Sequence, residues 1–228
     1  VMSVKGDDIV PRVQNAIPLH GFETVQPAYQ FIKGLLRHER ELKLDAEHMM
    51  VISPDEGGMS RAIYIANVLG LDMGMFYKRR DYTRVINGRN PIIAHEFLGT
   101  SVEGKDMIII DDMISSGDSV LEVAAALKER KAHKIFVFAT FGLFTSGFDK
   151  FDKAFETELI DRVLTTNLIY QTPELLQREW YINCDMSKYI AYIIDTLNHD
   201  SSISDLLNPN ERIQSILTRY KNGTLYPA

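Results

Sequence analysis

The sequence predicts an α/β fold in which helices flank a parallel β-sheet. From about residue 24 onward, short runs of β-branched and aliphatic residues alternate with longer amphipathic stretches. Residues 107–110 form a nearly continuous apolar run, which is typical of a parallel strand buried on both faces. Residues 48–77 have the pattern of strand, helix and strand, so we expect a βαβ unit with a right-handed crossover.

The spacing of apolar residues predicts each element in turn. The first helix is expected over residues 25–43, because Phe31, Ile32, Leu35, Leu36 and Leu42 share one helical face. The polar stretch 79–91 is expected to be a mobile loop, since it offers little that could be buried. The other expected strands are 48–52, 72–77, 92–98, 107–110, 134–139, 162–166 and 180–184, and the other expected helices are 59–69, 119–130, 151–158, 186–197, 203–207 and about 209–220.

Domain boundaries follow from the same pattern. No linker rich in Gly, Ser or Pro divides the chain, and we find no internal repeat. We therefore expect one domain over residues 25–221, with a remnant of an upstream domain or a linker over 1–24 and a loose tail over 222–228.

Composition narrows the function classes. The chain has 228 residues, a formal charge of −6 and 45% hydrophobic residues, as in a soluble globular protein. No apolar run approaches a membrane span, the first residues do not resemble a signal peptide, and the single Cys184 excludes an internal disulfide. The scattered basic residues argue against nucleic-acid binding. We expect a cytoplasmic protein with no nucleic-acid or membrane partner, in which Cys184 and Trp180 pack in the core and the six histidines show no ligand spacing.

The strongest motif is the segment 107–119. An apolar strand leads to two adjacent carboxylates, Asp111 and Asp112, and then to a run of small residues that opens a helix: Ser115, Ser116, Gly117, Asp118 and Ser119. Backbone N–H groups of such a loop, the positive end of the helix dipole and the hydroxyls can hold a phosphate. The carboxylates would then bind sugar hydroxyls, or a bridging Mg²⁺, on the same ligand. The alternative is a solvated acidic turn followed by a serine cap.

A second motif runs from residue 51 to residue 62. A strand is followed by Asp55 and the pair Gly57 and Gly58, and then by a helix. The glycines let the backbone approach an anion, and Asp55 is placed to hold a hard cation. The alternative is a plain turn with Asp55 as its cap.

A third motif is the basic run Lys78, Arg79 and Arg80 at the end of an expected strand. Fixed cations on a closing flap suit the charge that develops on a transferring phosphate. The alternative, for this run alone, is a solvated face.

Taken in order, these motifs resemble the ribose-phosphate pyrophosphokinase family, the phosphoribosyl-diphosphate (PRPP) synthetases. The resemblance covers about residues 11–207 and rests on Ser-Pro-Asp-x-Gly-Gly, Lys-Arg-Arg and Asp-Asp-Met-Ile-x-x-Gly. It implies a type I phosphoribosyltransferase-like domain, and transfer of diphosphate from Mg²⁺-ATP to the C1 hydroxyl of ribose 5-phosphate. It also implies assembly into homo-oligomers.

The resemblance implies a role for each motif. Asp111 and Asp112 would bind the ribose hydroxyls, and the loop from Ser115 to Ser119 would enclose the 5-phosphate. Asp55 would be the Mg²⁺ ligand of the diphosphate loop that contains Gly57 and Gly58. Lys78 and Arg80 would stabilise the transition state.

The chain departs from the family pattern in three places. Ile9 stands where relatives carry a histidine that helps to hold Mg²⁺-ATP, and Ser115 stands where many carry an acidic residue. Most of the family's first domain would lie upstream of residue 1, so the chain alone is expected to make little or no PRPP. Two other functions remain open: a non-catalytic sugar-phosphate-binding module of a synthetase complex, and a phosphoribosyltransferase.

Overall fold

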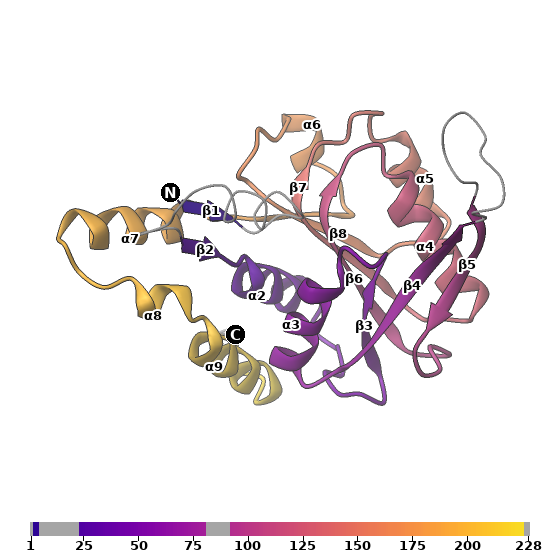
Figure 1. Ribbon diagram of the computed structural model, residues 1–228, viewed down its shortest axis with the longest axis horizontal. Coiled ribbons are helices and arrows are strands. Elements are labelled where there is room, and N and C mark those ends of the chain that lie inside the picture. Colours follow the sequence, from indigo (N-terminus) through magenta and orange to yellow (C-terminus); the bar gives the residue numbers. More distant parts are fainter. Residues whose placement is uncertain (1, 5–22, 81–91, 226–228) are drawn as a thin grey trace.

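The computed structural model describes residues 2–4, 23–80 and 92–225, and it describes side chains over residues 25–77 and 96–225. Its main feature is a seven-stranded sheet with the order β5-β4-β3-β6-β7-β8-β9, in which only β5 is antiparallel to its neighbour (Figure 1). The predicted α/β class with a parallel sheet is therefore confirmed. The strands are β3 (Met49–Ser53), β4 (Asp72–Arg80), β5 (Ile92–Leu98), β6 (Asp106–Ile114), β7 (Ile135–Gly142), β8 (Arg162–Thr166) and β9 (Tyr181–Cys184).

Helices cover both faces of the sheet. One face carries α4 and α5, whose apolar residues share a core cluster with Met107 and Ile109 of β6. The other face carries α2, α3 and α9, which pack on Ile108 and Ile110. The strand therefore buries both of its faces, as its unbroken apolar run predicts. The helices are α2 (Ala28–His38), α3 (Met59–Leu69), α4 (Asp118–Glu129), α5 (Asp149–Glu156), α6 (Pro173–Leu176), α7 (Ser187–Asn198), α8 (Ser204–Leu207) and α9 (Asn210–Lys221).

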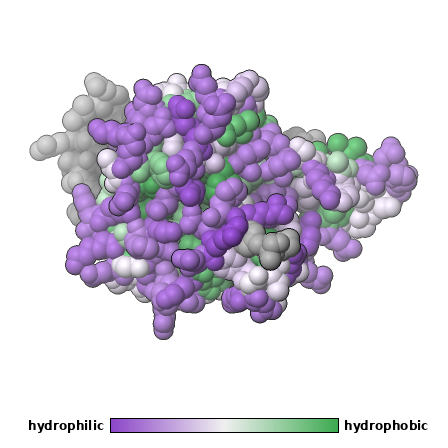
Figure 2. Space-filling view, turned by 180° about the vertical axis from the view of Figure 1, so that it is seen from behind, coloured by the Kyte–Doolittle hydropathy of each residue, from purple (hydrophilic) through white to green (hydrophobic). Residues whose placement is uncertain are grey.

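A smaller unit extends from one end of the molecule. The strands β1 (Met2–Val4) and β2 (Glu23–Val25) form a parallel pair, and Val25 packs with Met186, Tyr189 and Ile193 in a separate cluster. Figure 1 shows α7 projecting from the body beside this pair. Seen from behind, hydrophilic residues dominate the surface, with small apolar patches between them (Figure 2). None of the described helices is both long and apolar enough to span a bilayer.

Most expected elements are present with differences at their ends, and the structure adds β1, β2 and α6, which the sequence pattern does not predict. The first helix covers 28–38 rather than 25–43, because Pro27 precedes it and Glu39 leaves the helix in an extended conformation. The expected loop 79–91 begins too early, since Arg79 and Arg80 continue β4 and pair with Ala94 and Ile92 of β5. Residues 81–91, which include the rest of that loop, lie outside the described residues. Cys184 and Trp180 are buried, as expected.

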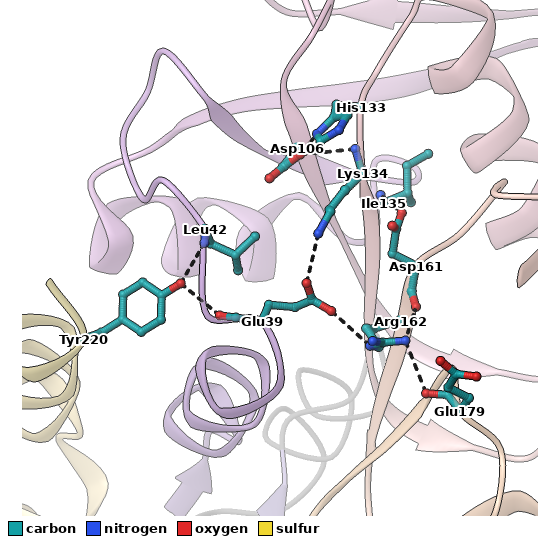
Figure 3. A network of polar contacts seen from close by, with 10 residues as sticks. All are labelled: Glu39, Leu42, Asp106, His133, Lys134, Ile135, Asp161, Arg162, Glu179 and Tyr220. Carbon is teal, nitrogen blue, oxygen red and sulfur yellow. Dashed lines mark hydrogen bonds and ion pairs between the residues drawn. The ribbon is translucent and has the colours of Figure 1, made fainter. Parts of the chain in front are cut away.

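Glu39 ties the end of α2 to two strands at the edge of the sheet opposite the carboxyl ends (Figure 3). Its carboxylate accepts from Lys134 Nζ at 3.0 Å and pairs with Arg162 Nε at 3.1 Å. The hydroxyl of Tyr220 donates to the carbonyl of Glu39 at 2.9 Å and accepts from the N–H of Leu42 at 2.7 Å. The same turn therefore also docks α9 against α2.

We expect Glu39→Gln to lower the free energy of unfolding by about 1–3 kcal/mol, because it leaves two partly buried cations without their shared carboxylate. The side chain of Glu39 is only 12% exposed. Glu103→Gln is the matched control, since its pair with Lys131 is 63% and 75% exposed and should change stability by less than about 0.5 kcal/mol. Urea unfolding of the three proteins measures both; equal effects would contradict the structural role of Glu39.

Candidate functional site

The order of the strands points to one edge of the sheet, at the carboxyl ends of β3 and β6, as the candidate binding edge. From β3 the chain continues to β4 on one side, and from β6 it continues to β7, β8 and β9 on the other side. The strands β3 and β6 are neighbours, with Ile52 opposite Ile109. The helices that follow them, α3 and α4, lie on opposite faces. Ligands of open α/β sheets bind at the carboxyl ends of such a pair of strands, where the strand order reverses.

The loop after β3 is fixed by short polar contacts. Ser53 Oγ donates to the carbonyl of Asp55 at 2.6 Å, and the N–H of Gly58 donates to Asp55 Oδ1 at 3.0 Å. One oxygen of Asp55 therefore caps the turn, as the alternative interpretation of this motif expected. A Cβ on Gly58 would lie 2.8 Å from Ser53 Oγ and 3.4 Å from the carbonyl oxygen of Ile110, so this position requires glycine. The contact with Ile110 brings the loop against β6.

The loop after β6 is built around Gly117. Its φ of +84° is a conformation that other residues rarely adopt, and a Cβ would lie 2.4 Å from the ring of Phe151. Gly117 is also the N-cap of α4, and Gly58 is the N-cap of α3, so neither N-cap residue has a side chain that could bond the first N–H groups of its helix. Two helix N-termini with N–H groups that lack a helical partner therefore open at neighbouring strand ends.

Polar side chains connect this second loop to the segment after β7. Ser115 Oγ lies 3.3 Å from Thr145 Oγ1, and Ser116 Oγ donates to Asp118 Oδ2 at 2.9 Å. Lys150 of α5 donates to Asp118 Oδ1. The bonds from Lys150 and Ser116 hold the pKa of Asp118 below its usual value. Lys150 thus balances a negative charge at the entrance of the predicted phosphate loop.

The acidic pair lies within β6 rather than after it. The sequence predicts that the strand ends at Ile110, whereas pairing with β7 continues to Ile114. Ile109 and Ile114 belong to the same core cluster although they are five residues apart, so the alternation of faces is lost around the acidic pair. Asp112 is buried at 7% exposure, and Asp111 is 18% exposed. Both carboxyl groups are therefore largely covered by protein.

Burial and the neighbouring carboxyl group control the ionisation of Asp111. Burial, and after it the neighbouring carboxyl group of Asp112, raise its pKa to about 7, while the N–H of Asp112 and the charge of Arg61 act in the opposite direction. The N–H of Asp112 donates to Asp111 Oδ1 at 2.8 Å, and Arg61 Nη2 lies 3.9 Å from the same oxygen. Arg61 belongs to α3, so this contact joins the two loop-and-helix units.

The sequence-predicted basic residues are placed only by their backbone. Lys78 and Arg80 lie in β4, whose side chains from residue 78 onward are outside the described residues. Met75 is the β4 residue opposite Ser53, the last residue of β3, so β4 continues about 16 Å beyond it. Both residues therefore lie on the strand that extends past the binding edge.

Sequence reasoning missed three residues that shape the site: Arg61, Thr145 and Lys150. Arg61 could have been found, because it lies in the first turn of the helix after Gly58 and must face the same sheet edge. Thr145 and Lys150 carry no such pattern, since only the parallel pairing of β6 with β7 brings their segment to the loop.

A possible metal-ligating group lies elsewhere. Among the described residues, Asp45, Glu47 and His48 place ligand atoms within 4.8 Å of one another, which the spacing of the histidines did not predict. Asp45 Oδ1 already accepts from the N–H groups of Glu47 and His48 and from His48 Nδ1. These bonds explain the cluster as an exposed turn.

Comparison with known proteins identifies the family. The sequence model described as "Phosphoribosyl synthetase-associated domain" matches residues 86–208, more than half of the chain. The chain belongs to the ribose-phosphate pyrophosphokinase family.

Individual members of the ribose-phosphate pyrophosphokinase family agree with this placement. The enzyme named ribose-phosphate pyrophosphokinase from Pasteurella multocida is 32% identical over 203 residues, which are 89% of this chain and 61% of that protein. The one from Mycoplasma genitalium is 39% identical over 129 residues, 56% of this chain and 37% of that protein. The chain thus spans about two-fifths to three-fifths of the length of these relatives.

A solved member of the ribose-phosphate pyrophosphokinase family confirms the fold. Phosphoribosylpyrophosphate synthetase from Mycobacterium smegmatis superposes with a TM-score of 0.61 at 21% identity, covering 79% of this chain and 53% of that one. The predicted type I phosphoribosyltransferase-like fold is therefore confirmed.

The raised pKa of Asp111 predicts how stability depends on pH. The folded protein keeps the proton that the unfolded chain releases near pH 4, so folded molecules bind more protons between pH 4 and about 7. Stability should fall as pH rises through this window. Asp111→Asn should remove this contribution and flatten the decline, which urea unfolding between pH 4.5 and 8 measures. A variant with the parent's slope would show that Asp111 does not titrate in this range.

Proposed function

We propose that this chain supplies the ribose-5-phosphate site of a ribose-phosphate pyrophosphokinase, an enzyme that transfers diphosphate from ATP to the C1 hydroxyl of ribose 5-phosphate. The proposal rests on one arrangement at the carboxyl ends of β3 and β6, where the strand order reverses; we call this place the switch point. There the glycine-capped N-termini of α3 and α4 lie beside the covered pair Asp111 and Asp112. A sugar phosphate needs this combination: N–H donors for its phosphate and carboxylate acceptors for its hydroxyls.

The loop after β6 would hold the 5-phosphate. The N–H groups from Ser115 to Ser119 open the helix, and the exposed hydroxyls of Ser115 and Ser119 add donors. Asp111 and Asp112, directly before the loop, would accept hydrogen bonds from ribose hydroxyls. Their burial suits this task, because a hydrogen bond to a carboxylate is stronger where water is excluded.

The loop after β3 would hold the diphosphate with Mg²⁺. Gly57 and Gly58 let the backbone approach phosphate oxygens. Asp55 is half-buried, and its Oδ1 accepts from the N–H of Gly58 within the turn. Mg²⁺ is bound in many phosphate-transfer sites by one or two carboxylates together with substrate phosphates. A single Asp55 therefore fits the ion, which when bound would neutralise phosphate charge.

Positioning of the two substrates and neutralisation of phosphate charge would account for the acceleration of diphosphate transfer. The C1 oxygen would attack the β-phosphorus in line, and the bond from that phosphorus to the oxygen bridging the α- and β-phosphates would break. AMP would leave with the bridging oxygen, and the hydroxyl proton would pass to water. No covalent nucleophile is needed. Lys78 and Arg80, on the strand that passes the binding edge, would stabilise the transferring group. Homo-oligomeric assembly and a cytoplasmic location remain predictions.

Ribose 5-phosphate should bind the parent chain and bind at least tenfold more weakly when both Asp111→Ala and Asp112→Ala are introduced, because the sugar hydroxyls lose their acceptors. Isothermal titration calorimetry measures the affinity. Asp205→Ala is the matched control, since this exposed carboxylate lies on α8, away from the switch point. In the full-length protein, Lys78→Ala should keep the affinity and lose PRPP formation.

Two results would count against the proposal. Unchanged affinity in the Asp111 and Asp112 double variant would remove the sugar assignment. Ribose 5-phosphate binding by the full-length parent without PRPP formation from Mg²⁺-ATP would instead favour a non-catalytic binding module.

A further inference from the structure

A second concentration of charge lies on the helical layer that contains α2, α7 and α9. Five basic side chains border adjoining hollows there: Lys33, Arg37, Lys188, Arg212 and Arg219. We call this surface the basic groove. Lys33 borders all three hollows, whose volumes are about 300, 230 and 130 Å³. In Figure 1, α9 lies beside α2 on the same side of the sheet.

The basic groove is positive in a chain whose formal charge is −6. Within the described part of the chain, none of its five cations forms an ion pair, although Lys134 and Arg162 elsewhere share the carboxylate of Glu39. Two carboxylates border the hollows, Asp185 and Glu211. Asp185 accepts from Asn167 Nδ2 at 2.7 Å and from the N–H of Ser187 at 2.8 Å, so hydrogen bonds within the protein already engage it.

The surroundings of Lys33 disfavour its charged form. Partial burial lowers its pKa first, and the charges of Arg37 and Lys188 lower it further, while the charge of Asp185 acts in the opposite direction. A bound anion would relieve this repulsion.

Arg212 and Arg219 donate to the backbone carbonyls of Leu206 and Thr224, but within the described residues no carboxylate pairs with the five cations. A cluster of like charges without paired carboxylates is costly to a fold and is typical of a site for a ligand of opposite charge.

The spacing of the charges indicates a ligand larger than one phosphate. Lys33 and Arg37 are one helical turn apart on α2, and Arg212 and Arg219 are two turns apart on α9, about 10 Å along the axis. The ring of Tyr29 lies between the two helices, 5.9 Å from Lys33 Nζ and 5.5 Å from Arg212 Cζ. The cations therefore line a path along both helices, with an aromatic surface beside it.

We propose that the basic groove binds a small molecule that carries two or more linked phosphate groups. The hollows have the size of a small-molecule site, and Asp185 and Glu211 at their borders would repel a longer polyanion. The site is separate from the switch point, because none of its lining residues belongs to the loops after β3 and β6. The proposal does not depend on the proposed function.

Inorganic triphosphate is the probe that tests the groove. The variant with Lys33→Ala and Arg37→Ala should bind it at least tenfold more weakly than the parent at low ionic strength, and salt should weaken the parent's binding. Neither side chain has a hydrogen bond among the described contacts, so the fold should be retained, which thermal unfolding checks. Lys153→Ala is the matched control: an exposed lysine on α5, on the opposite face of the sheet.

A second variant and a second measurement keep the outcome clear. Arg219→Ala, on the other helix, should also weaken binding, and triphosphate should slow amide exchange along α2 and α9. Comparing the affinities of inorganic triphosphate and a nucleoside triphosphate distinguishes the two sources of the phosphate chain. If the nucleotide binds more tightly than triphosphate to the parent but not to Tyr29→Ala, its base stacks on that ring.

Two outcomes would overturn the proposal. One is a parent protein that does not bind triphosphate at low ionic strength. The other is triphosphate binding that is unchanged in the Lys33 and Arg37 double variant and in the Arg219 variant, while amide exchange slows only at the loops after β3 and β6. In that case the phosphates would occupy the switch point alone.

Discussion

The parallel pairing of β3 with β6 is the constraint on which the site depends. It places Ile52 opposite Ile109, so the two strands deliver their loops to the same edge. Because the chain leaves these strands in opposite directions, α3 and α4 cover opposite faces and leave their N-termini open between them. The contact of Arg61 with Asp111 and the close approach of Gly58 to Ile110 then hold the two loops together.

Charged residues form three separate groups, at the switch point, around Glu39 and in the basic groove, and their surroundings differ. At the switch point, burial makes Asp111 costly to ionise, and Arg61 and Lys150 offset the negative charge there. At the opposite edge, Glu39 balances Lys134 and Arg162 and contributes to the stability of the fold. The basic groove differs from both, since its cations outnumber the carboxylates that border it.

The sequence predicts the elements well where the apolar pattern is unambiguous. The helix 59–69 and the strands 92–98 and 162–166 match the structure, because turn-forming residues bound them on both sides. The sequence predicts too short a strand before Asp111 and Asp112, since two carboxylates are typical of a strand end, whereas backbone pairing with β7 continues the strand to Ile114. The two interpretations of Asp55, as a turn cap or as a cation ligand, cannot be ranked from the sequence, because both require the same residue type. The structure shows the turn cap. Lys150 reaches Asp118 across 32 residues, and such a contact depends on tertiary structure alone.

The central claim is that the loops at the switch point form a sugar-phosphate site, and amide hydrogen exchange with ribose 5-phosphate tests it most directly. The first N–H groups of α4 have no partner within the helix, so their exchange should be fast until a phosphate accepts from them. The account predicts that ribose 5-phosphate slows exchange over Ser116–Ser119 and leaves α9 unchanged. Slowed exchange confined to α2 and α9, or no change in the loop at a saturating concentration of the sugar phosphate, would contradict it.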